Sequence, residues 1–128
     1  MSKLIGLVGH CGPDGFMLRS AVKYAVADSN VKMLNSTAEL QRGLEEGAVL
    51  LLVNRVLDST YDHELGCDLI RDLKVSHPGV ATMLISNFSD AQATAEAAGA
   101  LPGFGKSEVG SAKMKQRLAA ALNQTAAT

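Results

Sequence analysis

The sequence lacks the features that mark several large classes of protein. It has only two cysteines in 128 residues, and a chain of this length buries roughly two-thirds of its unfolded surface without needing disulfides. No apolar run approaches the roughly 20 residues of a membrane span, and the apolar run at the start is too short for a signal peptide. A formal net charge of −1 provides no basic surface for nucleic acid or anionic lipid. We therefore expect a soluble, cytoplasmic domain that binds neither nucleic acid nor membrane.

What the chain does contain is a regular alternation of short apolar runs and helical patterns. This order is typical of a parallel sheet covered by helices on both faces. The apolar runs predict five strands: Lys3–Gly9, Val31–Asn35, Ala48–Asn54, Ala81–Phe88 and Leu101–Gly105. We expect one α/β domain over residues 1–124, a flavodoxin-like (βα)5 doubly wound parallel sheet of strand order 2-1-3-4-5. Residues 125–128 are expected to form a frayed tail.

Two stretches match the capping box that begins many helices. They are Ser36-Thr37-Ala38-Glu39 and Ser89-Asp90-Ala91-Gln92, in which a serine and an acid or amide three residues later bond to each other's backbone N–H groups. They predict helices that begin after the second and fourth strands.

The strand order directs attention to two loops. In doubly wound sheets the ligands and the chemistry lie at the carboxyl ends of the strands where the winding reverses, here strands one and three. The first loop, Gly9–Gly15, holds three glycines, which either bring backbone N–H groups close to an anion or form a tight turn into the next helix. The second loop follows Asn54.

Several segments resemble the receiver domain of two-component response regulators. Ala48–Asn54 is similar to the third strand of that family, which ends in the phospho-accepting aspartate. Gly66–Arg71 is similar to the start of its third helix. Thr82–Ser86 and Ala98–Lys106 are similar to the fourth strand with its hydroxyl residue and to the Ala-Gly-Ala…Lys segment of strand five. The resemblance covers most clearly the chain from residue 48 onward.

The resemblance assigns family roles to five positions, of which three have lost the required chemistry. Ser86 and Lys106 match the hydroxyl and the lysine that contact the phosphoryl group. The acceptor position is Asn54, whose amide oxygen is a far weaker nucleophile than a carboxylate. The two Mg²⁺-binding acids are replaced by Gly9 and His10, which offer no carboxylate oxygen. We interpret these five residues as a degenerate phosphorylation site, expect no cofactor and no enzymatic activity, and expect Lys106 to hydrogen-bond Asn54.

Other departures surround this site. The aromatic position of strand five is Gly103, with Phe104 beside it, and the loop Arg55–Leu65 (the long loop) is about four residues longer than the family's. The long loop carries Asp58 and Asp62. Either of them could serve as a displaced phosphate acceptor.

The resulting hypothesis is a pseudo-receiver, a phosphorylation-independent signalling adaptor that acts through protein–protein contacts. Receivers often bind partners, or a second copy, through the face formed by their fourth helix, fifth strand and fifth helix. In this sequence that face comprises Ala91–Ala100, Phe104 and residues 107–124. A homodimer is one of the assemblies this face predicts.

The alternative is a ligand- or metal-binding sensor that uses the Gly9–Gly15 loop. Nitrogen and sulfur ligands for a soft divalent metal are available from His10, Cys11, His63 and Cys67. None of these pairs has the close spacing of common metal motifs, and a buried cysteine is more often part of the core. The Gly9–Gly15 loop also has a weak resemblance to the histidine loop of cobalamin-binding domains, although Val8 stands where that motif has an acid.

Overall fold

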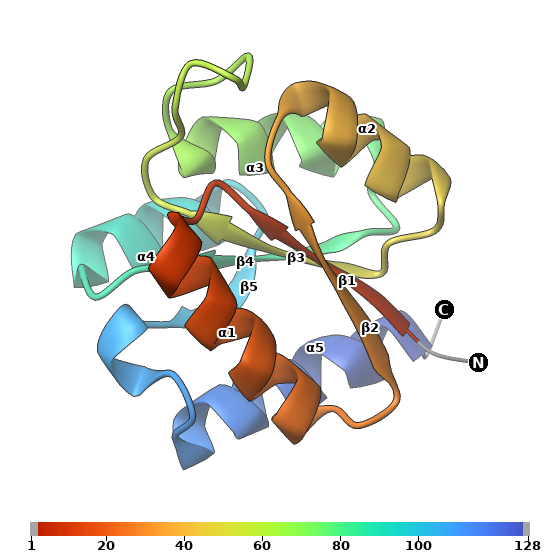
Figure 1. Cartoon of the computed structure of the whole chain (residues 1–128). Helices are drawn as coiled ribbons and strands as arrows, with labels where there is room; N and C mark the ends of the chain where they lie inside the picture. Colours follow the sequence, from red (N-terminus) through yellow and green to blue (C-terminus); the bar gives the residue numbers. More distant parts are fainter. Residues whose placement is uncertain (1–2, 127–128) are drawn as a thin grey trace.

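The chain forms a sheet of five parallel strands with helices on both faces (Figure 1). The computed structural model describes residues 3–126, with side chains through Asn123. The strands are β1 (Lys3–Val8), β2 (Ser29–Leu34), β3 (Leu50–Asn54), β4 (Ala81–Ile85) and β5 (Leu101–Phe104). The helices are α1 (Gly12–Ala25), α2 (Thr37–Glu45), α3 (Gly66–Ser76), α4 (Ser89–Ala97), the 3-10 helix η1 (Lys106–Glu108) and α5 (Ala112–Ala126).

The strand order is β2-β1-β3-β4-β5, and all four pairings are parallel. This confirms the predicted flavodoxin-like doubly wound sheet. The winding reverses between β1 and β3, so their carboxyl ends lie side by side at the point where such folds place their sites. β4 is shorter than predicted and ends at Ile85. The pairing of β4 with β5 shifts register between Met83 and Ile85, and the chain turns away toward α4 after this irregularity.

Alternate residues of the central strands build two apolar layers. Leu51 and Val53 face a cluster formed with α2, α3 and α4, whereas Leu50 and Leu52 face a cluster formed with α1 and α5. Because both faces are covered, the strand needs leucine or valine at every position, which explains its continuous apolar sequence. The same two layers hold the carboxyl ends of the strands in place beneath the loops.

The two predicted capping boxes have different outcomes. Ser36 begins α2 as predicted, since its side chain accepts a hydrogen bond from the backbone N of Glu39 at 3.1 Å. The box at Ser89 is wrong, because Phe88 is the N-cap of α4 and makes no side-chain cap. The Gln92 side chain turns toward the sheet instead.

Gln92 fastens α4 to the ends of two strands. Its Nε2 donates to the carbonyl oxygens of Leu84 at 2.9 Å, Ser86 at 3.1 Å and Phe104 at 3.3 Å. These carbonyls lie beside the register shift in the β4–β5 pairing, and that of Phe104 also accepts a hydrogen bond from the backbone N of Ser86 at 3.1 Å. The Gln92 amide therefore makes three hydrogen bonds at the sheet in place of the single cap bond it would make at the N-terminus of α4.

The end of α5 includes part of the expected tail. The helix continues through Ala126, and residues 127–128 lie outside the described residues. Within residues 3–126, no helix combines the length and the apolar character needed to cross a bilayer.

Candidate functional site

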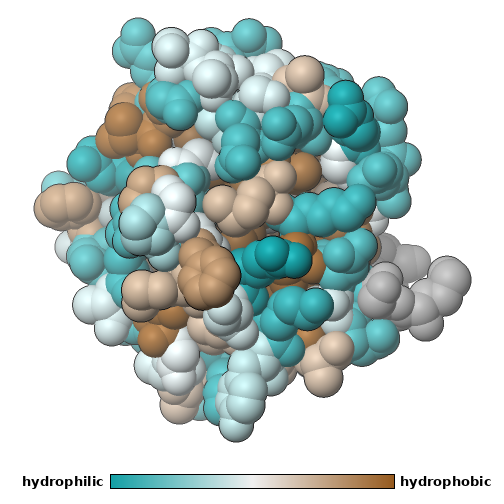
Figure 2. Space-filling model, viewed as in Figure 1, coloured by the Kyte–Doolittle hydropathy of each residue, from teal (hydrophilic) through white to brown (hydrophobic). Residues whose placement is uncertain are grey.

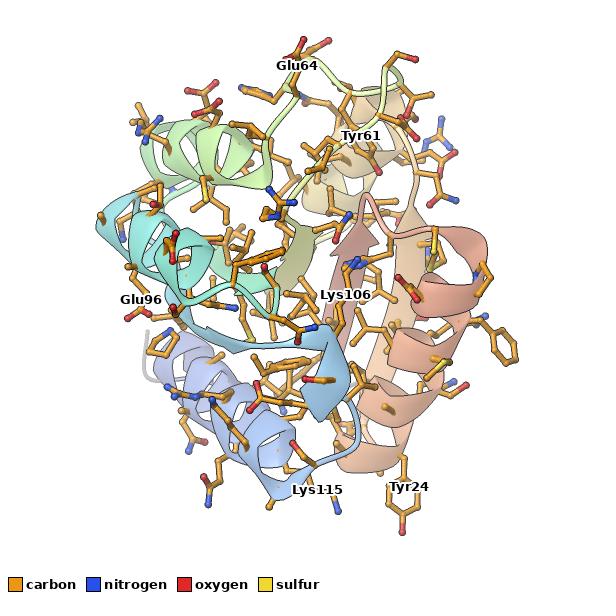
Figure 3. The ribbon with its side chains drawn as sticks, turned by 90° about the vertical axis from the view of Figure 1, so that its left-hand side faces the viewer. Tyr24, Tyr61, Glu64, Glu96, Lys106 and Lys115 are labelled. Carbon is orange, nitrogen blue, oxygen red and sulfur yellow. The ribbon has the colours of Figure 1, made fainter. Side chains whose placement is uncertain are left out.

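A pocket of about 220 Å³ lies at the carboxyl ends of β3 and β4, beside the start of η1. Asn54, Ser86 and Lys106 share it, and Figure 3 shows Lys106 near the ends of the central strands. The full lining is Asn54, Arg55, Val56, Ile85, Ser86, Asn87, Phe88 and Lys106. These described residues include two cationic side chains and no carboxylate, so the lining offers none of the ligands that Mg²⁺ prefers.

The amide of Asn54 joins the ends of β1 and β3. Its Nδ2 donates to the carbonyl oxygen of Gly9 at 3.1 Å and to that of Val56 at 2.9 Å. Only the NH₂ group can donate, so these two bonds set the direction in which the amide faces. Its Oδ1 is buried and accepts no hydrogen bond from the described part of the chain. A carboxylate at this position would face two carbonyl oxygens without a proton to share, so the surroundings favour the neutral amide.

His10 and Gly9 occupy the positions where the resemblance placed metal-binding acids. The His10 side chain is 8% exposed, and its Nε2 donates to the carbonyl oxygen of Leu52 at 2.9 Å. Burial lowers the pKa of His10 below its usual 6.5; the bond to Leu52 opposes this shift and Lys106 adds to it. Gly9 has a φ of +81°, and a Cβ there would lie 2.3 Å from Cδ2 of Leu57. Position 10 therefore holds a neutral ring, and the left-handed backbone at position 9 disfavours any residue with a side chain.

The buried neutral imidazole predicts a pH dependence of stability. In the unfolded chain His10 takes up a proton near pH 6.5, whereas in the folded chain its lowered pKa keeps the ring neutral. The free energy of unfolding should therefore fall as the pH drops below 6.5, by up to about 1.4 kcal/mol per pH unit, until the folded pKa is reached. Urea unfolding between pH 7 and about pH 5 measures this slope.

The matched variants for this test are His10→Gln and His77→Gln. His10→Gln should flatten the slope, and His77→Gln, in the turn after α3, should retain it. Three carboxyls, those of Asp14, Asp58 and Glu108, also have a lowered pKa. They change the stability only at pH values near or below their usual pKa values of 3.8 to 4.5, which lie outside the range between pH 5 and pH 7. An unchanged slope in His10→Gln would contradict the neutral buried ring.

Lys106 does not bond Asn54, so that expectation is wrong. Its Nζ lies 3.4 Å from Oδ2 of Asp14 in the first turn of α1. A hydrogen bond from the Cys11 thiol and the pairing with Lys106 lower the pKa of Asp14. The physical reason is charge, because a carboxylate is a stronger partner for an ammonium group than a neutral amide oxygen is.

Ser86 has a local structural role at the floor of the pocket. It is buried just after β4, and its Oγ accepts a hydrogen bond from the backbone N of Phe88 at 3.2 Å. Phe88 is exposed at the rim, where the guanidinium carbon of Arg55 lies 4.8 Å from the ring centroid. Such a cation–π contact holds Arg55 beside the pocket.

Tyr61 is a residue of this region that sequence reasoning missed. It lies in the long loop and is 8% exposed; its hydroxyl donates to the carbonyl oxygen of Leu34 and accepts from the backbone N of Gly9 at 2.9 Å. Burial raises the pKa of Tyr61 to about 12, so the hydroxyl keeps its proton at neutral pH. Tyr61 thus bridges the ends of β1 and β2. The one available signal was an aromatic residue within an unusually long polar loop.

Neither aspartate of the long loop is placed to replace the missing acceptor. Asp58 accepts hydrogen bonds from the Thr60 hydroxyl and from the backbone N of Thr60 at 2.9 Å, and these two bonds lower its pKa. Asp62 lies further along, against α2, where its backbone N donates to Oγ1 of Thr37 at 2.9 Å. Neither residue lines the pocket that contains Asn54 and Lys106. Neither Asp58 nor Asp62 therefore lies where a displaced phosphate acceptor would have to be.

The candidate metal ligands do not meet. His10 is buried, Cys11 is exposed, and Cys67 is buried in the core. His63 is paired with Asp72, their Nε2 and Oδ2 atoms 2.5 Å apart. Across residues 3–126 no three His, Cys, Asp or Glu side chains are grouped so as to hold a metal ion. The Gly9–Gly15 loop therefore lacks partners for a metal site.

The expected partner surface changes in one respect. Phe104 is 1% exposed and belongs to the core under α5, so it cannot contact a partner. Strand alternation places it inward once β5 pairs through Ile85. Within Ala91–Ala100, Ala95 is buried whereas Ala97 is exposed. What the α4 side offers is a surface of small side chains.

Comparisons with known proteins find structural similarity only. No model of a known protein family and no curated protein matches the sequence. Among solved structures, the RcsB response regulator of Salmonella typhimurium superposes with a TM-score of 0.78 at 15% identity, over 96% of this chain and 61% of that one. NtrX from Brucella abortus gives a TM-score of 0.80 at 16% identity, over 98% of this chain and 28% of that one.

A shorter structure matches over its whole length. A response regulator from Thermotoga maritima has a TM-score of 0.77 at 15% identity, covering 96% of this chain and 99% of that one. The chain spans less than two thirds of the RcsB and NtrX chains, so it corresponds to a part of each. At these identities the comparisons establish that the chain has the fold of a response-regulator receiver domain.

Proposed function

We propose that this receiver-like chain is a phosphorylation-independent signalling domain that acts through contacts with other proteins. The observation that carries the proposal is the amide of Asn54, which donates to the carbonyl oxygens of Gly9 and Val56 at the end of β3. A side chain whose hydrogen bonds connect two strand ends has a structural role, and this one offers no carboxylate to accept a phosphoryl group. With His10 neutral nearby, phosphoryl transfer lacks both its nucleophile and its metal ligands.

The attachment of α4 supports a conformation that needs no chemical trigger. The Gln92 amide donates to three carbonyl oxygens from β4, the segment after it and β5. Displacing α4 would break all three bonds, and although Phe104 would keep its bond from the backbone N of Ser86, each buried acceptor left unsatisfied would cost roughly 1–3 kcal/mol. A domain fastened in this way can present one constant surface to a partner.

The surface best suited to protein contact lies on α1. Phe16, Met17 and Tyr24 are 70%, 61% and 83% exposed, and we call them the α1 surface. Figure 2 shows apolar side chains among hydrophilic ones over this helix. Aromatic side chains and methionine are enriched at protein interfaces. The small side chains of α4 provide a second, flatter surface, and a second copy of the chain is one possible occupant of either.

The proposal is tested by partner capture before and after treatment with acetyl phosphate and Mg²⁺. We expect no mass gain of one phosphoryl group on the intact chain, and the same set of cross-linked proteins under both conditions. Phe16→Asp should remove those proteins, because a charge would face an apolar contact, while the fold should change by less than about 0.5 kcal/mol. Sedimentation of the purified chain then shows whether a second copy is among them.

The matched control is Ala97→Asp on the exposed side of α4. If Ala97→Asp abolishes capture and Phe16→Asp does not, contact runs through α4 and the α1 surface is wrong. A stoichiometric phosphoryl gain on the wild-type chain would refute phosphorylation independence. A monomer that captures nothing under either condition would refute action through protein contacts.

A further inference from the structure

A groove of about 420 Å³ lies between α2 and α3, away from the ends of β3 and β4. Its sides come from one face of each helix and from the middle of the long loop. The lining residues that matter here are Leu40, Leu44, Leu69, Leu73, Asp62 and Asp72. Ligand sites of small molecules commonly occupy roughly 300–1,000 Å³, so the groove has sufficient volume for a small organic molecule.

The groove forms because the two helices that line it pack against different strands of the sheet. α2 packs against β1 and β2, whereas α3 packs against β3, β4 and α4. The long loop fills the space between them at one end, where Tyr61 is fixed by its bonds to Leu34 and Gly9. The rest of the space between the two helices stays open, and Figure 1 shows α2 and α3 as neighbours along the same face of the sheet.

The floor of the groove is apolar. Leu40, Leu69 and Leu73 are core residues whose edges form the floor, and Leu44 is partly buried beside them. Val75, which is 83% exposed, lies at the rim. Because Leu40, Leu69 and Leu73 are only 4%, 6% and 5% exposed, a flat hydrocarbon body placed here would mainly cover the exposed apolar surface of Leu44 and Val75.

The groove is lined by carboxylates and imidazoles. Asp62 and Asp72 contribute two carboxylates, His63 and His77 contribute imidazoles, and no Lys or Arg belongs to the described lining. His63 occupies one oxygen of Asp72, at 2.5 Å, and leaves its other oxygen for a further donor. The groove therefore combines an apolar floor with an acidic rim, and its charge is complementary to that of a cation.

We propose that the groove between α2 and α3 binds a small organic cation, a molecule with an apolar body and an amino or guanidino group. The apolar body lies on the leucines, and the cationic group donates to Asp62 and Asp72. This site is separate from the Gly9–Gly15 loop and from the pocket that contains Lys106. It goes beyond the proposed protein contacts and stands or falls independently of them.

The two parts of the groove contribute differently to affinity. Both carboxylates are exposed to water, Asp72 by 68% of its side chain, and ion pairs in such positions contribute little. The apolar side chains, chiefly Leu44 and Val75, therefore supply most of the binding, and the carboxylates decide the sign of charge that is accepted. This division predicts weak affinity together with clear discrimination between a cation and an anion of the same shape.

The test is an NMR titration of the full chain with phenethylamine and, separately, with 3-phenylpropionate. Phenethylamine should give saturable shifts of backbone amides in α2, α3 and the long loop, with a dissociation constant of about 1 mM. At the same concentrations 3-phenylpropionate should give no saturable shift there. The double variant Asp62→Asn/Asp72→Asn should weaken phenethylamine binding about threefold to tenfold, as expected for two exposed charge pairs.

The matched control is Asp68→Asn, which removes a carboxylate from α3 that pairs with Arg71 and does not line the groove. It should leave the titration unchanged. The proposal is overturned if phenethylamine at about 10 mM, tenfold above the expected constant, causes no saturable shift in α2 and α3. Equal binding of the anion, or shifts confined to another surface, would overturn it as well.

Discussion

Tyr61→Ala should lower the free energy of unfolding by about 3–5 kcal/mol, as large-to-small changes of buried aromatic residues do. The ring fills space between the ends of β1 and β2, and its hydroxyl serves the carbonyl oxygen of Leu34 and the backbone N of Gly9. Removing it leaves a cavity and also two backbone groups without their partner. Urea unfolding followed by circular dichroism measures the loss.

Two comparisons separate the parts of this effect. Tyr61→Phe keeps the ring and should cost about 1–3 kcal/mol, the range for leaving buried hydrogen-bonding groups unpaired. Tyr24→Ala removes the other tyrosine, which is 83% exposed on α1, and should cost no more than about 1 kcal/mol, including its contact with Lys115. Figure 3 shows these two tyrosines at opposite ends of the molecule. Equal losses for Tyr61→Ala and Tyr24→Ala would contradict the bridging role of Tyr61.

Gly103→Ala should destabilise the chain by about 2–3 kcal/mol, the upper part of the range for forcing extra atoms into a packed region. A Cβ at this position would lie 2.1 Å from the carbonyl oxygen of Leu84 and 2.9 Å from Oε1 of Gln92. The first of these atoms belongs to the backbone of β4 and cannot move aside without distorting the sheet. The position that the resemblance matched to an aromatic side chain thus resists even a methyl group in this chain.

Gly79→Ala is the matched control, since a Cβ at that turn position would meet no atom within 4 Å. This variant should change stability by less than about 0.5 kcal/mol, or raise it slightly by restricting the unfolded chain. The comparison is made by thermal unfolding of the two variants and the wild type. A Gly103→Ala variant as stable as Gly79→Ala would show that β4 and β5 have space that the structure does not indicate.

The fold could be predicted because its determinants are local and repeated. Continuous apolar runs such as Leu50–Asn54 indicate strands covered on both faces, and the helical patterns between them leave few topologies. The strand ends were less predictable. β4 ends at Ile85 because of a register shift against β5, and a shift of pairing leaves no mark in the sequence of either strand.

The positions of the site residues could be predicted where they depend only on the order and direction of the strands. Asn54 ends β3 and Lys106 comes just after β5, and because these strands run parallel both side chains reach the same edge of the sheet. Their partners depend on competition among side chains. Lys106 pairs with Asp14, which lies 92 residues away in sequence, and Gln92 bonds three strand carbonyls although the residues around it match a helix cap. In both cases long-range geometry outweighed a local pattern.

The hydrogen bonds of the Tyr61 hydroxyl hold the long loop against the strand ends, so the structure of the site depends on whether this loop is closed or locally open. Its two hydrogen bonds span 52 and 27 residues of sequence, so the long loop closes over the strand ends as a unit. Such a unit can open with less free energy than the sheet needs to unfold. The amide proton of Gly9 would then exchange with solvent at a rate set by the loop, while amides in β3 exchange only on global unfolding. The arrangement around Asn54 can therefore be lost through local opening of the loop, for example at higher temperature or in mild denaturant, while the core of the sheet stays folded.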